Sequence, residues 1–169
     1  MMDIQITLAS REDFSEMILL AGATLPDRMN VHELKKYFEL FPQLLFKATD
    51  QGRLIGFACA GVDMFQKTGW LLFSNVAASY QGKGIGKRLI AARIHALRQI
   101  PTIQCIRVTV SDTNTASIKA LQAHGLRFSH QELDYYGPGK HRDIMELPIL
   151  PALSDQANLV LFQEMPEAR

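Results

Sequence analysis

The chain has 169 residues, of which 47% are hydrophobic and 21% are charged. A chain of this length buries roughly 70% of its unfolded surface as one domain, and its composition excludes disordered and collagen-like architectures. Eighteen basic residues against seventeen acidic ones give a net charge of +1, which indicates neither a nucleic-acid-binding protein nor one held at a membrane surface.

The N-terminus and the cysteines predict where the protein works. The first residues lack the basic flank and apolar core of a signal peptide, and no apolar run approaches the roughly 20 residues that span a bilayer. Cys59 and Cys105 each lie in an apolar, strand-like stretch, which favours two reduced core thiols over a disulfide or a metal site. We therefore expect a cytoplasmic protein without a metal.

Hydrophobic periodicity and turn signals predict strands and helices along most of the chain. Ser10 with Asp13 resembles a capping box at the start of the first helix, and Gly22 and Pro26 mark the loop after it. In chain order, the expected elements are a strand over 4–9, helices over 11–21 and 31–41, strands over 44–49, 54–62 and 70–77, a helix over 84–99, a strand over 104–110, a helix over 114–123, and strands over 127–134 and 142–147.

This order of elements predicts the fold class. Hairpin-linked strands come first and β-α-β crossovers second, so we expect an α/β protein with a mixed sheet flanked by helices. Residues 1–150 are expected to form this single domain, and residues 151–169 a C-terminal extension. In the helix over 84–99, the expected buried stripe consists of Ile85, Leu89, Ala92 and Ala96.

A glycine-rich segment, Gln81-Gly-Lys-Gly-Ile-Gly-Lys87, joins a strand to the following helix. Its glycines allow close approach of a ligand to the backbone, and the free N–H groups of the helix start favour phosphate. A Walker A loop is excluded because Gln81 replaces its first glycine and Arg88 its hydroxyl residue. A dinucleotide fingerprint is excluded because its third glycine would fall on Lys87.

The segment resembles the acyl-CoA loop of the Gcn5-related N-acetyltransferase (GNAT) superfamily, Gln/Arg-x-x-Gly-x-Gly/Ala, which Gln81, Gly84 and Gly86 match. The resemblance extends over the strands at 72–76 and 107–110, over 114–126, and over the element order, and is strongest with ribosomal-protein-alanine N-acetyltransferases. It implies a GNAT-like fold and transfer of acetyl from acetyl-CoA to a primary amine, which attacks the thioester directly.

The resemblance also implies roles for individual residues. The backbones of Ser74 and Val76 would bind the pantetheine arm, the N–H groups of 82–87 would bind the pyrophosphate, and the Val76 N–H would polarise the thioester carbonyl. The implied cofactor-binding residues are Ser74, Asn75, Val76, Gln81, Gly82, Lys83, Gly84, Ile85, Gly86, Lys87 and Asn114. Two alternatives stay open: Asn114 as a plain helix cap, and Lys83, Lys87 and Arg88 as solvated surface charges.

The sequence departs from the family pattern where proton transfer takes place. Leu121 occupies the position of the family's general-acid tyrosine, Thr109 stands where related enzymes carry a glutamate base, and residues 68–76 contain no Asp, Glu or His. An α-amine, with a pKa of about 7.7–8.0, needs a base less than a lysine amine at about 10.4 does. The pattern therefore favours a less basic acceptor, such as a protein N-terminal α-amine.

The last hairpin offers substitute acids. Tyr136 is the candidate catalytic residue, with a cross-strand aromatic pair of Tyr135 and Tyr136 as its structural alternative, and His141 is a weaker candidate. Two other functions stay open: acetylation of a small amine such as a polyamine or antibiotic, and a catalytically weak CoA-binding regulatory domain. We expect no nucleic acid or membrane partner, and either a monomer or a homodimer.

Overall fold

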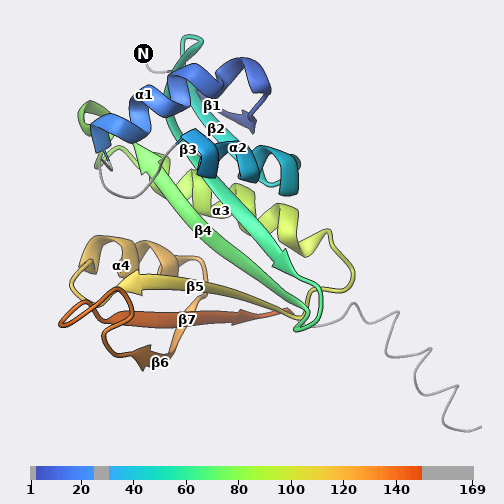
Figure 1. Ribbon diagram of the computed structural model, residues 1–169, viewed down its shortest axis with the longest axis vertical. Coiled ribbons are helices and arrows are strands. Elements are labelled where there is room, and N and C mark those ends of the chain that lie inside the picture. Colours follow the sequence, from blue (N-terminus) through green and yellow to red (C-terminus); the bar gives the residue numbers. More distant parts are fainter. Residues whose placement is uncertain (1–2, 25–30, 150–169) are drawn as a thin grey trace, which may run out of the picture.

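The computed structural model describes residues 3–24 and 31–149 as one mixed seven-stranded sheet with helices on both faces (Figure 1). The elements are β1 (Ile4–Leu8), a 3-10 turn η1 (Arg11–Asp13), α1 (Phe14–Thr24), α2 (Val31–Leu40), β2 (Leu45–Asp50), β3 (Arg53–Asp63), β4 (Thr68–Val76), η2 (Ala78–Tyr80), α3 (Ile85–Arg98), β5 (Cys105–Ser111), α4 (Thr115–Ala123), β6 (Arg127–Glu132) and β7 (Arg142–Pro148). The predicted fold class and element order are confirmed.

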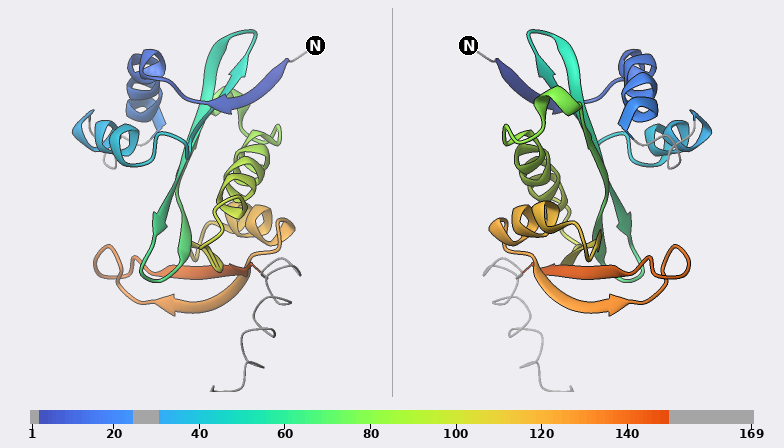
Figure 2. Two further views of the ribbon diagram at one scale, coloured as in Figure 1. Left: turned by 90° about the vertical axis from the view of Figure 1, so that its right-hand side faces the viewer. Right: turned by 90° about the vertical axis from the view of Figure 1, so that its left-hand side faces the viewer.

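The sheet has the strand order β1-β2-β3-β4-β5-β7-β6, and β4–β5 is its parallel pair. Figure 2 shows α1 and α2 on one face of the sheet and α3 and α4 on the other. The first face packs around Met17, Leu34 and Phe57, and the second around Leu97 and Ile106, all fully buried. The site described below lies on the α3 face, where this core opens between β4 and β5.

The first helix differs from its prediction. Residues 11–13 form a 3-10 turn, and α1 then runs through Gly22 to Thr24. A glycine in a helix costs only about 1 kcal/mol. Burial of the α1 side chains Met17 and Ala21 against the sheet offsets this cost. The Ser10–Asp13 capping box is present, with the Ser10 N–H donating to Asp13 at 2.7 Å. Pro26, Asn30 and the extension over 151–169 lie outside the described residues.

The buried stripe of α3 also differs from its prediction. Ile85 and Leu89 are buried as expected, but Ala92 and Ala96 are only half-buried, and the fully covered positions beyond Leu89 include Arg93 and Leu97. The helix is rotated so that the 89–93–97 row faces β3 and β4. A charged side chain therefore stands at a core position of this helix.

β4 is bulged against β3, and its pairing with β5 ends at the same point. Cys59 of β3 pairs with Phe73 and Ala60 pairs with Leu71, so Leu72 has no partner on β3. The parallel pairing of β4 with β5 covers only Thr68–Leu71 against Cys105–Val108. Beyond this point the strands diverge, as Figure 1 shows.

The described residues carry neither a membrane-spanning helix nor a cluster of metal ligands. No helix among them is long and apolar enough to cross a membrane. Within 3–24 and 31–149, no three His, Cys, Asp or Glu side chains gather as a group that could hold a metal ion. Both cysteines are free thiols, Cys59 buried and Cys105 half-buried.

Candidate active site

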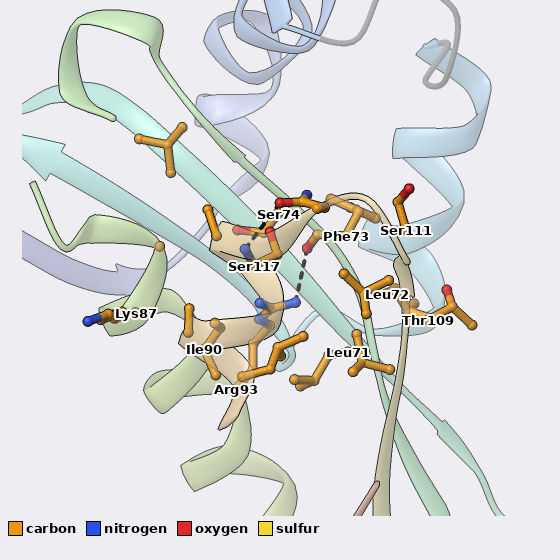
Figure 3. Close-up of a pocket in the computed structure, with 18 of the residues that line it drawn as sticks. Leu71, Leu72, Phe73, Ser74, Lys87, Ile90, Arg93, Thr109, Ser111 and Ser117 are labelled. Carbon is orange, nitrogen blue, oxygen red and sulfur yellow. Dashed lines mark hydrogen bonds between the residues drawn. The ribbon is translucent and has the colours of Figure 1, made fainter. Parts of the chain in front are cut away.

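A cavity of about 590 Å³ opens where β4 and β5 diverge. Its walls are the bulged half of β4, the glycine-rich loop, α3, the end of β5 and the first turns of α4. Figure 3 shows Leu71 to Ser74 of β4 facing Thr109 and Ser111 of β5 across it, with Ile90 and Arg93 of α3 at its base. Tyr136 and Arg142 line it from the β6–β7 side. The cavity thus runs from the start of α3, between the strands, to the β6–β7 turn.

The glycine-rich loop presents backbone N–H groups at one end of the cavity. Gly82 and Gly84 have left-handed backbones, with φ of +74° and +81°, and no atom lies within 4 Å of a Cβ added at either. Gly84 is the N-cap of α3 and offers no side chain, and the first turn of the helix carries no acidic residue. Among the described residues, the first amides of α3 therefore lack intrahelical or side-chain partners, an arrangement that binds anions.

The end of β4 turns its backbone toward the cavity at Val76. The Ala77 N–H donates to the Ile55 carbonyl at 2.9 Å, so the alternation of an antiparallel ladder points the Val76 groups away from β3. In agreement, the Gln81 side chain donates to the Val76 carbonyl at 3.2 Å. This bond ties the loop to the strand and leaves the Val76 N–H directed into the gap.

Asn114 caps a helix and also lines the cavity. It is the N-cap of α4, where its Oδ1 accepts the Ser117 N–H at 3.1 Å. It also lines the cavity together with Ser117. Because Oδ1 is used by the cap, the Nδ2 donor is the part of this side chain that a ligand would meet.

The far end of the cavity is aromatic. The strand expected over 127–134 ends at Glu132, and Tyr135 and Tyr136 lie in the β6–β7 turn, where a Gly-Pro-Gly sequence breaks the ladder. Their rings contact each other edge-on with centroids 4.7 Å apart, and only Tyr136 lines the cavity. The Arg142 guanidinium lies over the Tyr136 ring at 4.8 Å. His141 instead accepts the Asp134 N–H at 3.0 Å.

Tyr37 of α2 lies near this aromatic end, against Phe73 of β4. Its ring contacts Phe73 at 4.8 Å, and its hydroxyl donates to Glu33 at 3.2 Å. Burial, the charge of Glu33 and, more weakly, Tyr136 raise the pKa of Tyr37 to about 12. Tyr37 therefore stays protonated at neutral pH, and in the described part of the chain it contacts the cavity only through Phe73.

Arg93 is a buried cation in the wall of the cavity. Its side chain is 3% exposed; Nη1 donates to the Cys59 and Phe73 carbonyls at 3.2 and 3.1 Å, and Nε donates to the Leu89 carbonyl at 3.2 Å. Figure 3 shows it reaching up from α3 to the β4 bulge. Burial lowers its pKa to about 10, partly offset by the nearby Cys59 thiol. The guanidinium is therefore charged at neutral pH.

The structure separates the predicted site residues into two groups. Those that line the cavity are Ser74, Val76, Gln81, Gly82, Gly84, Gly86, Lys87, Asn114 and Tyr136. Asn75 faces the other side of the sheet, 3% exposed, with its Nδ2 unpartnered among the described residues. Lys83 lies over the Tyr80 ring at 4.8 Å, and Ile85 is a core side chain. Arg88 donates to the Ile4 carbonyl of β1 at 2.8 Å.

Sequence reasoning missed four lining residues with polar chemistry, Arg93, Ser111, Ser117 and Arg142. Arg93 was hidden among apolar neighbours, although its spacing of four from both Leu89 and Leu97 is a usable signal. Arg142 is the first residue of β7, and no motif or periodicity in the sequence marks it. Ser117 lies one turn into α4. In the described chain, the titratable groups that line the cavity are Lys87, Arg93, Tyr136 and Arg142, without a carboxylate, histidine or thiol.

Comparisons with known proteins agree with this geometry. Residues 12–126 match the model of the acetyltransferase (GNAT) family. Spermine/spermidine N(1)-acetyltransferase of Bacillus subtilis (strain 168) is 33% identical over 93 residues, which are 52% of this chain. The match spans 60% of the length of this relative.

Solved structures show the same fold. The ribosomal-protein-S18-alanine N-acetyltransferase from Escherichia coli superposes with a TM-score of 0.74 at 21% identity, covering 88% of this chain and 96% of that one. The yncA protein from Salmonella typhimurium, a putative acetyltransferase solved with its cofactor acetyl-CoA, has a TM-score of 0.76 at 18% identity, covering 89% and 96%. With its family model, loop, bulged β4 and diverging strands in agreement, the chain belongs to the acetyltransferase (GNAT) family.

Proposed function

We propose that the protein is an N-acetyltransferase that moves the acetyl group of acetyl-CoA directly to a primary amine. The observation that carries this proposal is the single cavity that joins the uncapped start of α3 to the aromatic β6–β7 end through the gap between β4 and β5. Acetyl-CoA, which supplies an activated thioester, is the ligand found with the yncA protein.

The residues present fit this ligand. The amides of 82–87 would hold the pyrophosphate, and Lys87 would add a positive charge beside it. The backbone of Ser74 and Val76 would bind the amide-rich arm along the open edge of β4, with the Asn114 side chain on the opposite wall. The Val76 N–H would polarise the thioester carbonyl. Tyr136, at the acceptor end, is the candidate for proton exchange.

Direct transfer is favoured over a covalent enzyme intermediate. Neither cysteine lines the cavity in the described chain. Burial raises the pKa of Cys59 to about 12, although the charge of Arg93 opposes the shift, and its thiol donates to the Ala60 carbonyl at 3.3 Å. A thiol in this state does not supply the thiolate nucleophile that a two-step route needs.

For the acceptor, we propose a weakly basic amine, with a protein or peptide N-terminal α-amine as the leading class. Three cations and no carboxylate line the cavity in the described residues, so a polycationic substrate would meet repulsion there. A polyamine is the second candidate, because the Bacillus subtilis relative is named as a spermine/spermidine N(1)-acetyltransferase.

The first experiment is the melting temperature with acetyl-CoA, CoA, ATP and NAD at matched concentrations. A ligand at 100 times its Kd adds about 2.7 kcal/mol, which is a rise of roughly 5–10 °C for a domain of this size. We expect this rise with both CoA species. A larger response to ATP or NAD contradicts the proposal.

Turnover then identifies the acceptor. We expect CoA release with peptides that carry a free N-terminus, and much less with the same peptides after N-terminal blocking. Faster turnover of spermidine than of every peptide moves the assignment to the polyamine class. CoA binding without turnover of any amine favours the regulatory alternative.

A further inference from the structure

Arg93 keeps hydrogen-bonding capacity that the fold does not use. A guanidinium has five N–H donors. Three of these have acceptors, the carbonyls of Leu89, Cys59 and Phe73. Within residues 3–24 and 31–149, both N–H groups on Nη2 are without a partner, and the side chain lines the cavity.

The charge of Arg93 is likewise uncompensated by the fold. The ion pairs of the described residues do not include it, and its polar contacts are three neutral carbonyls. Burying a cation without a carboxylate partner is unfavourable, and an apolar side chain would suit its place between Leu89 and Leu97. Anchoring the β3–β4 bulge accounts for Nη1, and the bond to the Leu89 carbonyl of α3 accounts for Nε, but neither requires the charge or Nη2.

The proposed reaction creates negative charge on this side of the cavity. The amine nitrogen forms a bond to the acetyl carbon, the carbon–sulfur bond breaks with its electron pair passing to sulfur, and the proton lost by nitrogen passes to water. The arm that ends in this sulfur enters from the α3 loop, on whose helix Arg93 lies. Tyr136 and Arg142 line the opposite, β6–β7 end.

Resting on the function proposed above, we infer that Arg93 is a catalytic residue whose free Nη2 donors and buried positive charge stabilise the departing CoA thiolate. The leaving group then departs as an anion and needs no proton donor on the α3 side. Leu121 of α4, which also lines the cavity and is 4% exposed, contributes an apolar side chain that lowers the polarity of the cavity. Low polarity strengthens the interaction between the guanidinium and sulfur.

The test measures the ionisation of the thiol of CoA bound to the protein. Thiolate absorbance in the ultraviolet is followed from about pH 6 to about pH 9.5, around the ordinary thiol pKa of about 8.5. The same protein with desulfo-CoA, which lacks the thiol, supplies the baseline. Burial raises the pKa of Cys59 to about 12 and raises that of Cys105, so the protein thiols contribute little change.

We expect the bound thiol to titrate at least one pH unit below free CoA, as an opposite charge within about 4–6 Å produces. In Arg93→Met the titration should return to that of free CoA, and kcat should fall at least about tenfold with KM for acetyl-CoA little changed. Arg98→Met is the matched control, because Arg98 is exposed on the same helix and does not line the cavity. CoA bound to Arg98→Met should have the same thiol titration as CoA bound to the wild type.

The outcomes separate this inference from the proposed function. An unshifted thiol in wild-type protein that binds CoA overturns the role of Arg93 and leaves the acetyltransferase proposal standing. An equal shift in Arg93→Met has the same consequence. Failure of the wild type to bind CoA overturns the proposed function itself. Should Arg93→Met not fold, Arg93→Lys is the second variant. It keeps the charge and should retain most of the downward shift of the CoA thiol pKa. Loss of that shift in a folded Arg93→Lys protein also refutes the inference.

Discussion

Asn114 allows the helix cap and the ligand contact to be measured separately. Its Oδ1 accepts the Ser117 N–H at 3.1 Å, and the residue also lines the cavity. Asn114→Ala removes the cap and the Nδ2 donor together. Asn114→Asp keeps an oxygen acceptor for the cap, removes the donor, and places a negative charge on the wall where we propose that acetyl-CoA binds.

The two effects have different magnitudes. Loss of an N-cap costs about 1 kcal/mol, which lowers the melting temperature by roughly 2–4 °C in a protein of this size. The aspartate variant should keep the wild-type stability without ligand, because a carboxylate caps a helix as well as an amide does. If either variant binds acetyl-CoA tenfold more weakly, a ligand concentration of 100 times the wild-type Kd adds about 1.4 kcal/mol to the unfolding free energy, rather than about 2.7 kcal/mol.

The assay is thermal unfolding of wild type and both variants, each with and without acetyl-CoA. The expected pattern is a lower melting temperature without ligand for Asn114→Ala alone, and a smaller ligand-induced rise for both variants. Two results would refute the reasoning. An unchanged melting temperature of ligand-free Asn114→Ala shows that the cap bond does not stabilise α4, and a full ligand response in Asn114→Asp shows that ligand does not approach this wall.

Three further variants test the fold around the site. Gly84→Ala adds a methyl group in open space at φ +81°, so the strain is in the backbone, about 1–2 kcal/mol, and should appear as a lower melting temperature with a weaker acetyl-CoA response. Gly69→Ala places a Cβ 2.9 Å from the fully buried Leu97, and overpacking should lower the free energy of unfolding in urea by about 1–3 kcal/mol; an unchanged urea midpoint contradicts this. Burial raises the pKa of Asp13, but its bonds to Lys47 and Ser10 outweigh burial and lower it. The stabilisation that the ionised Asp13 gives the fold is present above the ordinary Asp pKa of about 3.9 and is lost as pH falls. The difference in unfolding free energy between wild type and Asp13→Asn should therefore narrow below about pH 4. A difference that is constant with pH argues against the ionised pair.

The fold was predictable because its signals are local. Alternating strands, the turn at Gly52 and the glycine-rich loop each depend on a few neighbouring residues, and together they fixed the element order. Helix boundaries were less predictable, since α1 continues through Gly22 under the influence of its packing against β3. A local propensity of about 1 kcal/mol yields to tertiary burial of that kind.

The site was predictable only where its chemistry lies in backbone patterns. The loop amides follow from glycine spacing, whereas the bulge at Leu72 depends on how β3 and β4 pair. The position of Arg93 follows from the rotation of α3 against that pair. Periodicity assigns a lone cation to the exposed face by default, so the sequence alone hides this residue.

The balance of charges in the cavity predicts how rate depends on the basicity of the acceptor. Lys87, Arg93 and Arg142 favour a thiolate and oppose an ammonium ion, and no carboxylate among the described lining residues takes a proton from the incoming amine. The amine must therefore enter in its neutral form. At pH 7 an α-amine with a pKa near 8 is neutral about 200 times more often than a lysine amine at about 10.4.

We therefore expect kcat/KM for an N-terminal α-amine to rise tenfold per pH unit below its pKa and then level off, while kcat/KM for a lysine side chain keeps rising beyond it. The measurement compares two peptides of the same sequence, one with a free N-terminus and a blocked lysine and the other with the blocks exchanged. If the two peptides have equal kcat/KM at pH 7 and neither value changes with pH, a base removes the proton within the site. In that case Tyr136 is the residue to replace first, with phenylalanine, because its side chain lines the acceptor end of the cavity and carries a hydroxyl.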